Sequence, residues 1–155
     1  MSRWPGKAEK QATTFGKLNR SQLMSLVRST GNLTTEVRLA KLMKAARLRG
    51  YRRHLPITGH PDFAWTKEKV AVFVHGCFWH GHDCGRNLTP KQNVKAWREK
   101  IIRNKRRDRS VARELRKQGW VVIHIWECRL AEYPSLCLRR VSTALGKRRA
   151  EVSTS

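Results

Sequence analysis

Apolar positions repeat along this chain with a helical period in some segments and as short continuous runs in others, which predicts both helices and strands. Residues 34–48 carry Leu39, Met43 and Ala46 at helical spacing and predict an amphipathic helix. Glu36 falls on the same face as Met43, so an acid is placed where burial is expected. It either takes part in a site or frays with the first turn, where the helix dipole stabilises it.

A second, longer helix is predicted between Thr89–Pro90 and Gln118–Gly119, with or without a break. Its inward stripe is spaced four and three residues apart: Trp97, Ile101, Asn104, Asp108, Val111 and Leu115. Asn104 and Asp108 are polar residues in an otherwise apolar stripe. They either mark a solvated bend or contact something polar in the sheet.

Four short apolar runs predict the strands of a sheet. The runs at 51–55, 62–65 and 70–74 are separated by turn residues and predict a three-stranded meander. Residues 120–126 form the strongest strand pattern, and we expect this strand at the centre of the sheet.

The order of these elements predicts a single α/β domain, in which helices flank a mixed sheet. A short helix from Ser21 precedes the elements above, and a last helix is predicted over 135–145. We expect the domain to span residues 20–146, between a basic arm at 1–19 and a C-terminal tail at 147–155.

The charge of the chain predicts a polyanionic partner. Lys and Arg total 34 against 11 Asp and Glu, which gives a formal net charge of +23. Nucleic acid is the usual partner of such a chain, and a protein that only neutralises phosphate charge is the alternative. No apolar run approaches the length of a transmembrane helix. We therefore expect a cytoplasmic, nucleoid-associated protein with no membrane partner.

Thiols and imidazoles gather in the segment 77–84, and together they predict a metal site. Cys77 and Cys84 bracket a short turn that also contains His82, and Cys128 ends the strand predicted at 120–126. Three thiols and one imidazole can complete a tetrahedral zinc site. The spacing alone leaves open which histidine binds, and free buried thiols are the alternative.

One acid and two histidines are candidate catalytic groups. Asp62 begins an otherwise apolar strand, where a carboxylate holds Mg²⁺ or, more commonly, makes a turn hydrogen bond. His75 and His80 lie one strand away, and an imidazole that activates water beside bound Mg²⁺ suffices for phosphodiester hydrolysis. Phe78 and Trp79 can stack on bases or wedge between them, or instead cap the core.

Residues 20–129 of the chain resemble the very-short-patch-repair (Vsr) mismatch endonucleases. The resemblance is carried by segments in the family's order: Pro61-Asp62-Phe63, the run from His75 to His80, His82-x-Cys84, Arg107-Asp108-Arg109, Gly119-Trp120 and Trp126-Glu127-Cys128. It implies a restriction-endonuclease-like fold related to the PD-(D/E)xK nucleases. It also implies a monomeric enzyme that nicks double-stranded DNA 5′ to the thymine of a T:G mismatch, where 5-methylcytosine has been deaminated.

The resemblance implies catalytic roles for six residues. Asp62 and the backbone carbonyl of Val74 resemble the ligands of a catalytic Mg²⁺, and His80 resembles the general base. The remaining active-site groups that it implies are His75, Asp108 and Glu36. Among these, Asp108 resembles a partner that orients the catalytic imidazole.

Two further sets of residues are implied by the same resemblance. The ligands of a structural Zn²⁺ would be Cys77, His82, Cys84 and Cys128. The side chains that enter DNA beside the mismatch would be Phe78, Trp79 and Trp97 from the major groove, and Met24 and Val27 from the minor groove.

The chain departs from the family pattern at Val74, where the family usually has Thr, and at Gly81 and Asp83, which interrupt its histidine run. Two other functions are therefore compared with mismatch nicking. One is a zinc-stapled endonuclease of other specificity, and the other is a zinc-stabilised DNA-binding protein without catalysis. Asp62, His75 and His80 together argue against the second, because a protein that only binds has no need of them.

Overall fold

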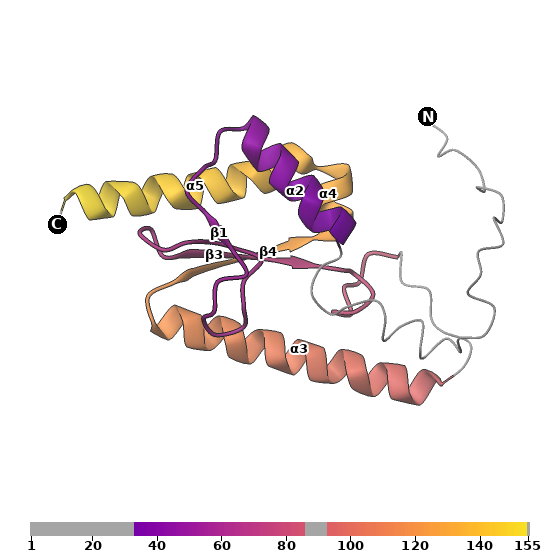
Figure 1. Cartoon of the computed structure of the whole chain (residues 1–155). Coiled ribbons are helices and arrows are strands. Elements are labelled where there is room, and N and C mark those ends of the chain that lie inside the picture. The colour runs from indigo at the N-terminus through magenta and orange to yellow at the C-terminus, as the bar shows by residue number, and fades with distance from the viewer. Residues whose placement is uncertain (1–32, 86–92, 155) are drawn as a thin grey trace.

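The computed structural model describes residues 33–85 and 93–154, and in this part of the chain a four-stranded sheet lies between two layers of helices (Figure 1). The strands are β1 (Arg52–Arg53), β2 (Phe63–Trp65), β3 (Val70–His75) and β4 (Val121–Trp126). The helices are α2 (Leu33–Ala45), α3 (Val94–Lys117), α4 (Glu127–Glu132) and α5 (Pro134–Ser153). Helices α2, α4 and α5 cover one face of the sheet and α3 covers the other. The predicted class, a mixed sheet flanked by helices, is confirmed.

The strand order is β1-β2-β3-β4. The predicted meander is confirmed, because β1, β2 and β3 pair antiparallel in sequence order. The prediction that residues 120–126 form the central strand is wrong: β4 pairs only with β3, in parallel, and is an edge among the described strands. Its apolar pattern arises because α3 and α5 cover its two faces, and not because strands lie on both sides.

Side chains of β3 alternate between the two faces of the sheet, and this alternation positions the site. Val70 and Val72 face the larger core, which also contains Leu39 and Met43 of α2. The alternate residues of β3, Ala71 and Phe73, face α3 and pack with its Leu115. His75 follows this second set, so the end of β3 directs an imidazole toward α3.

Helix α3 is continuous from Val94 to Lys117, so the solvated bend considered at its polar positions does not occur. All six residues of the predicted stripe are at least partly buried: Trp97, Ile101, Asn104, Asp108, Val111 and Leu115. The Asn104 side chain donates to the Trp79 carbonyl at 2.9 Å, and Asp108 contacts the imidazole of His80. The two polar residues therefore hold the loop that follows β3.

The C-terminal helix is longer than the expected 135–145, because α5 continues to Ser153 through most of the segment expected as a tail. Arg148 fixes this extension by donating to the carbonyls of Glu68 and Gly119 at 2.8 and 2.6 Å. Arg149 adds an ion pair with Glu68 at 2.8 Å. The short helix α4 was not predicted; it connects the end of β4 to α5.

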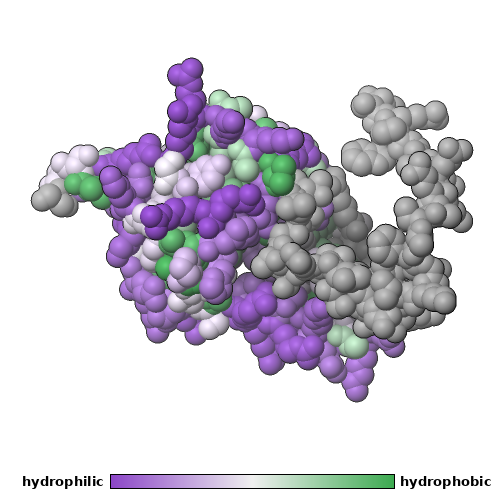
Figure 2. Space-filling model, in the orientation of Figure 1, coloured by the Kyte–Doolittle hydropathy of each residue, from purple (hydrophilic) through white to green (hydrophobic). Residues whose placement is uncertain are grey.

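Some predicted features lie outside the described residues. They are the arm at 1–19, the helix from Ser21 with Met24 and Val27, and the helix start at Thr89–Pro90. The helix predicted at 34–48 is present as α2, but it ends at Ala45, so the predicted face residue Ala46 lies beyond it and is exposed. Figure 2 shows a largely hydrophilic surface, as the charge of the chain requires. No helix in the described part of the chain is sufficiently long and apolar to cross a membrane.

The turn that precedes β2 packs closely on α3. Gly59 has φ +78°, and a Cβ atom there would lie 2.2 Å from Val111 Cγ1. We predict that Gly59→Ala lowers the free energy of unfolding by about 1–3 kcal/mol through backbone strain and overpacking. Gly146 in α5 is the control: an added Cβ meets nothing within 4 Å, so Gly146→Ala should stabilise by about 0.5–1 kcal/mol. Urea unfolding measures both, and a Gly59→Ala protein as stable as the wild type would contradict this packing.

Candidate active site and metal centre

The loop at residues 76–84 directly follows β3 and carries most of the candidate site. Its backbone turns back on itself, with His82 N–H donating to the Cys77 carbonyl at 2.9 Å and Cys84 N–H to the His82 carbonyl at 3.1 Å. Gly81 lies against α3 with φ +59°, and a Cβ there would be 2.5 Å from Ile101 Cγ2. Only glycine fits this close approach of the loop to the helix.

Four residues from two distant segments form a compact Cys/His cluster: Cys77, His82, Cys84 and Cys128. One potential ligand atom of each lies within 4.8 Å of those of the others. The His82 ring stacks on Trp126 at 4.2 Å, and its Nδ1 is 3.4 Å from Cys128 Sγ. The structure therefore brings together the four residues predicted as zinc ligands, whereas Cys137 is buried in the core.

The donor set of this cluster fits a soft or borderline metal ion. Burial, together with the neighbouring sulfurs of Cys128 and Cys84, raises the pKa of Cys77 to about 12. A bound cation removes this penalty, because thiolates are its ligands and its charge offsets theirs. Three sulfurs and one imidazole nitrogen are a typical ligand set of a tetrahedral zinc site.

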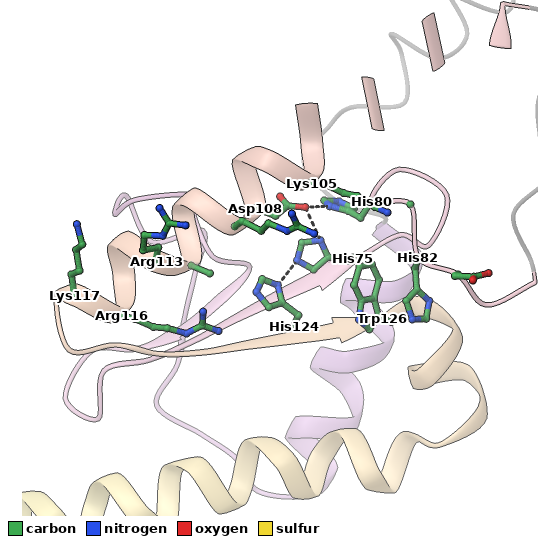
Figure 3. A pocket seen from close by; sticks show the side chains of 14 residues that line it. His75, His80, His82, Lys105, Asp108, Arg113, Arg116, Lys117, His124 and Trp126 are labelled. Atoms are coloured by element: carbon green, nitrogen blue, oxygen red, sulfur yellow. Dashed lines mark hydrogen bonds and ion pairs between the residues drawn. The ribbon is translucent and has the colours of Figure 1, made fainter. Parts of the chain in front are cut away.

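A chain of imidazoles and one carboxylate runs from the loop across α3 to the sheet (Figure 3). Asp108 Oδ2 is 2.5 Å from His80 Nδ1 and 3.7 Å from His75 Nδ1. On its other side, His75 Nε2 is 2.6 Å from Nδ1 of His124. These groups line a cavity of about 890 Å³, whose rim carries cations of α3, including Lys105, Arg109, Arg113 and Arg116.

The electrostatics of this chain distinguish an ionised acid from a neutral imidazole. Burial alone would raise the pKa of Asp108, but the hydrogen bond from His80 and the electrostatic attraction of the surrounding His80, His75 and Arg107 side chains outweigh it and lower that pKa. Burial, together with the unfavourable electrostatic influence of the neighbouring His80 and His124 rings, lowers the pKa of His75 to about 3. At neutral pH Asp108 is therefore a carboxylate and His75 is uncharged.

Two carboxyl groups, the buried Glu36 and the half-buried Asp62, lie together where α2 meets the start of β2. Glu36 is 2 % exposed, and its Oε2 is 2.9 Å from Arg53 Nη2 and 3.6 Å from His54 Nε2. One potential ligand atom each of Glu36, His54 and Asp62 lies within 4.8 Å of the others. Glu36 is therefore a buried, paired side chain, and the fraying first-turn acid considered from sequence is not what the structure contains.

Asp62 is the acid of this pair that is held against the sheet. Its Oδ2 accepts the backbone N–H of Val74 at 2.7 Å, which places it beside the residue that precedes His75. Burial raises the pKa of Asp62 to about 7; the Val74 hydrogen bond opposes this shift, and the nearby charge of Glu36 adds to it. Two acids that repel each other in a buried site fit a hard divalent cation, which would neutralise both.

Three aromatic rings, two from the loop and one from the first turn of α3, pack together. Phe78, Trp79 and Trp97 have pairwise centroid distances of 5.2, 5.5 and 5.3 Å, and all three are half-buried. Lys100 Nζ lies 4.7 Å from the Trp79 ring. These rings lie outside the buried core clusters of the described residues, so the alternative that Phe78 and Trp79 cap the core is not supported. Met24 and Val27, predicted to act with them, lie outside the described residues.

Sequence reasoning missed three residues of the site. Arg53 and His54, at the end of β1, contact Glu36, and His124 in β4 contacts His75. A signal for His124 was present, because Val122, His124 and Trp126 share one face of a strand whose other face is entirely apolar. Arg53 and His54 could not be found in this way, because their contacts with Glu36 of α2 depend on tertiary packing that no local sequence pattern indicates.

Comparison with known proteins identifies the family. Residues 12–86 match the family model described as DNA mismatch endonuclease Vsr. The DNA mismatch endonuclease Vsr of Escherichia coli is 35% identical over 119 residues, which cover 77% of this chain and 76% of that protein. The chain belongs to the Vsr family. Its resemblance to these enzymes, predicted from short motifs, is confirmed, and it is a DNA endonuclease.

The chain is also similar to type II nicking enzymes. The type II nicking enzyme V.XorIIP of Xanthomonas oryzae is 37% identical over 119 residues, covering 76% of this chain and 85% of that protein. The type II nicking enzyme V.NmeAIP of Neisseria meningitidis is 44% identical over 84 residues, covering 54% and 59%. Among solved structures, the catalytic domain of the homing endonuclease I-Bth0305I matches with a TM-score of 0.49 and 17% identity, covering 74% of this chain and 95% of that domain. A likeness this weak says nothing about function.

Proposed function

We propose that this Vsr-family protein is an Mg²⁺-dependent endonuclease that nicks double-stranded DNA 5′ to the thymine of a T:G mismatch. We further propose that it acts as a monomer on cytoplasmic, nucleoid DNA. One observation carries the proposal: a single loop presents an imidazole paired with an ionised carboxylate and also carries Phe78 and Trp79, whose rings pack with Trp97 of α3. The paired imidazole can activate water, and the aromatic rings can stack on bases or wedge between them.

The proposed chemistry assigns the acids and imidazoles separate tasks. Asp62 and the Val74 carbonyl would hold Mg²⁺, with Glu36 beside them; the ion would supply charge stabilisation at the scissile phosphate. His80 Nδ1–H donates to Asp108, which leaves Nε2 as the free basic nitrogen that accepts a proton from water. The Asp108 carboxylate then stabilises the imidazolium that forms.

The aromatic cluster is proposed to recognise the mismatch. A T:G pair is less stable than a matched pair, so separating it from its neighbours costs less. Phe78, Trp79 and Trp97 are already packed on one another, and the Asn104 side chain holds the Trp79 backbone. Such rings lose little conformational freedom on entering a base step. Met24 and Val27 are proposed to enter from the other groove.

The Cys/His cluster is proposed to hold a structural Zn²⁺ that fastens the loop to the end of β4. We predict that protein purified without chelator contains one equivalent of zinc per chain, because structural sites of this ligand set bind tightly. Cys128→Ser should abolish zinc binding and lower the melting temperature. Elemental analysis and thermal melting measure the two effects.

Cys137→Ala is the matched control for the zinc prediction, since Cys137 is also buried but lies in the core away from the cluster. Its zinc content should equal that of the wild type, whatever its effect on stability. Wild-type protein without zinc, or loss of zinc in the Cys137→Ala variant, would contradict the proposed ligand set.

The nicking proposal is tested with T:G and matched T:A duplexes, each in Mg²⁺ and in EDTA. Wild-type protein should nick only the T:G duplex, and only in Mg²⁺. Asp62→Asn should abolish nicking and leave mismatch binding largely intact, because it removes a metal ligand but not the aromatic cluster. His80→Ala should slow nicking about a hundredfold, the scale of a lost general base.

Several outcomes would contradict the proposed function. Equal nicking of T:G and T:A duplexes would indicate an endonuclease of other specificity. Nicking at the wild-type rate by Asp62→Asn, or in EDTA, would place the active site elsewhere. Binding without nicking under all conditions would favour a DNA-binding protein.

A further inference from the structure

His124 lies in β4 on the face that α3 covers, and in Figure 3 it is the last group of the imidazole chain, beyond His75. Its partner across the parallel pair is Phe73 of β3, and the two rings stack with centroids 5.7 Å apart and planes inclined by 25°. The next β3 residue on that face is His75, whose Nε2 is 2.6 Å from His124 Nδ1. His124 is therefore held by packing and directed at one atom.

This contact is the one hydrogen bond that holds the His75 ring among the described residues. His75 is 4 % exposed, and its Nδ1 is a buried nitrogen without a hydrogen-bond partner in the described structure. The 3.7 Å from that Nδ1 to Asp108 Oδ2 is an electrostatic contact, too long for a hydrogen bond. The His75 ring also packs against His80 and Trp126, but among the described residues the directional contact with one of its nitrogens comes from His124.

The positions of the charges decide which nitrogen carries the proton. An ionised carboxylate only accepts hydrogen bonds, so Asp108 favours a proton on the Nδ1 atoms of both His80 and His75, which face it. In its neutral form His75 has one ring proton, so with Nδ1 protonated beside Asp108 its Nε2 is an acceptor toward His124. His124 must then donate from Nδ1. Its remaining nitrogen is an unprotonated acceptor, which suits a cavity lined by arginines.

We propose that His124 is a positioning residue, which donates from Nδ1 to His75 Nε2 and holds His75 in the Nδ1–H tautomer against Asp108. The proposal rests on the proposed function, because Asp108 in turn orients the His80 base. Without the donor at 124, His75 can adopt the other tautomer and present a lone pair to the Asp108 carboxylate. That repulsion would loosen the contact between Asp108 and His80.

Two substitutions at the same position separate the donor from the packing. His124→Phe keeps an aromatic ring over Phe73 but removes the donor. His124→Asn restores an amide nitrogen near the position of Nδ1. Single-turnover nicking of the T:G duplex should be about tenfold slower in His124→Phe, the usual scale for a lost supporting contact, and should recover most of this loss in His124→Asn. The dissociation constant for the duplex and the melting temperature should stay close to wild type in both.

The tautomer itself is measured without DNA, by imidazole nitrogen NMR of the ¹⁵N-labelled full-length protein. Wild-type His75 should show a protonated Nδ1 and an unprotonated Nε2, and His124→Phe should shift this pattern toward a mixture of tautomers. A proton on Nε2 of wild-type His75 would overturn the proposal, as would wild-type nicking by His124→Phe. If wild-type protein fails to nick T:G DNA, the proposed function fails, while the spectrum still decides the role of His124.

Discussion

The loop at 76–84 is held by contacts with α3 and with Cys128, and the rest of the site depends on this constraint. Helix α3 holds the loop from one side, through the Asn104 side chain at the Trp79 carbonyl and Asp108 at His80. Cys128, in the first turn of α4, also contacts the loop: its backbone N–H donates to Cys77 Sγ at 3.4 Å, and its own Sγ lies 3.4 Å from His82 Nδ1. A loop of this length without such contacts would have to be ordered at the cost of its conformational entropy when DNA binds.

Because the loop is fixed at both sides, groups with different tasks keep a constant relation to one another. His80 faces the carboxylate and the cavity, while the neighbouring Phe78 and Trp79 pack with Trp97 away from it. The loop that carries Phe78 and Trp79, the rings proposed to enter the DNA base stack, therefore also carries His80, the proposed general base. On the proposed function this couples recognition to cleavage: a duplex that does not admit the rings does not bring its backbone to His80.

The sequence predicted the parts of the structure that depend on local periodicity. The stripe on α3, including the functional polar residues Asn104 and Asp108, follows from helical spacing, and the meander follows from its turns. The position of β4 was mispredicted, because an edge strand whose two faces are covered by helices has the same apolar pattern as a central strand. The length of α5 was also missed, because Arg148 makes anchoring contacts with residues far away in the chain.

In the candidate site, too, some residues could be predicted from local motifs and others depend on contacts between distant segments. The catalytic and metal-ligating candidates of the loop, with Asp62 and Asp108, could be named from motifs, and the structure places them in three clusters: one of cysteines and His82, one around Asp108 and one around Asp62. His124 could not be named in this way, because its significance arises from the parallel pairing of β4 with β3, which places it against His75. Contacts of this kind are fixed by the register of strands distant in sequence.

The central claim, that the clamped loop presents aromatic rings to the mismatch, is tested most directly by one ratio in one variant. The ratio is the nicking rate on T:G duplex divided by that on T:A duplex, measured for Trp79→Ala together with its melting temperature. The account predicts a lower ratio, with little change in melting temperature or in binding to matched DNA. An unchanged ratio with a lowered melting temperature would show that Trp79 only stabilises the fold, and would contradict the claim.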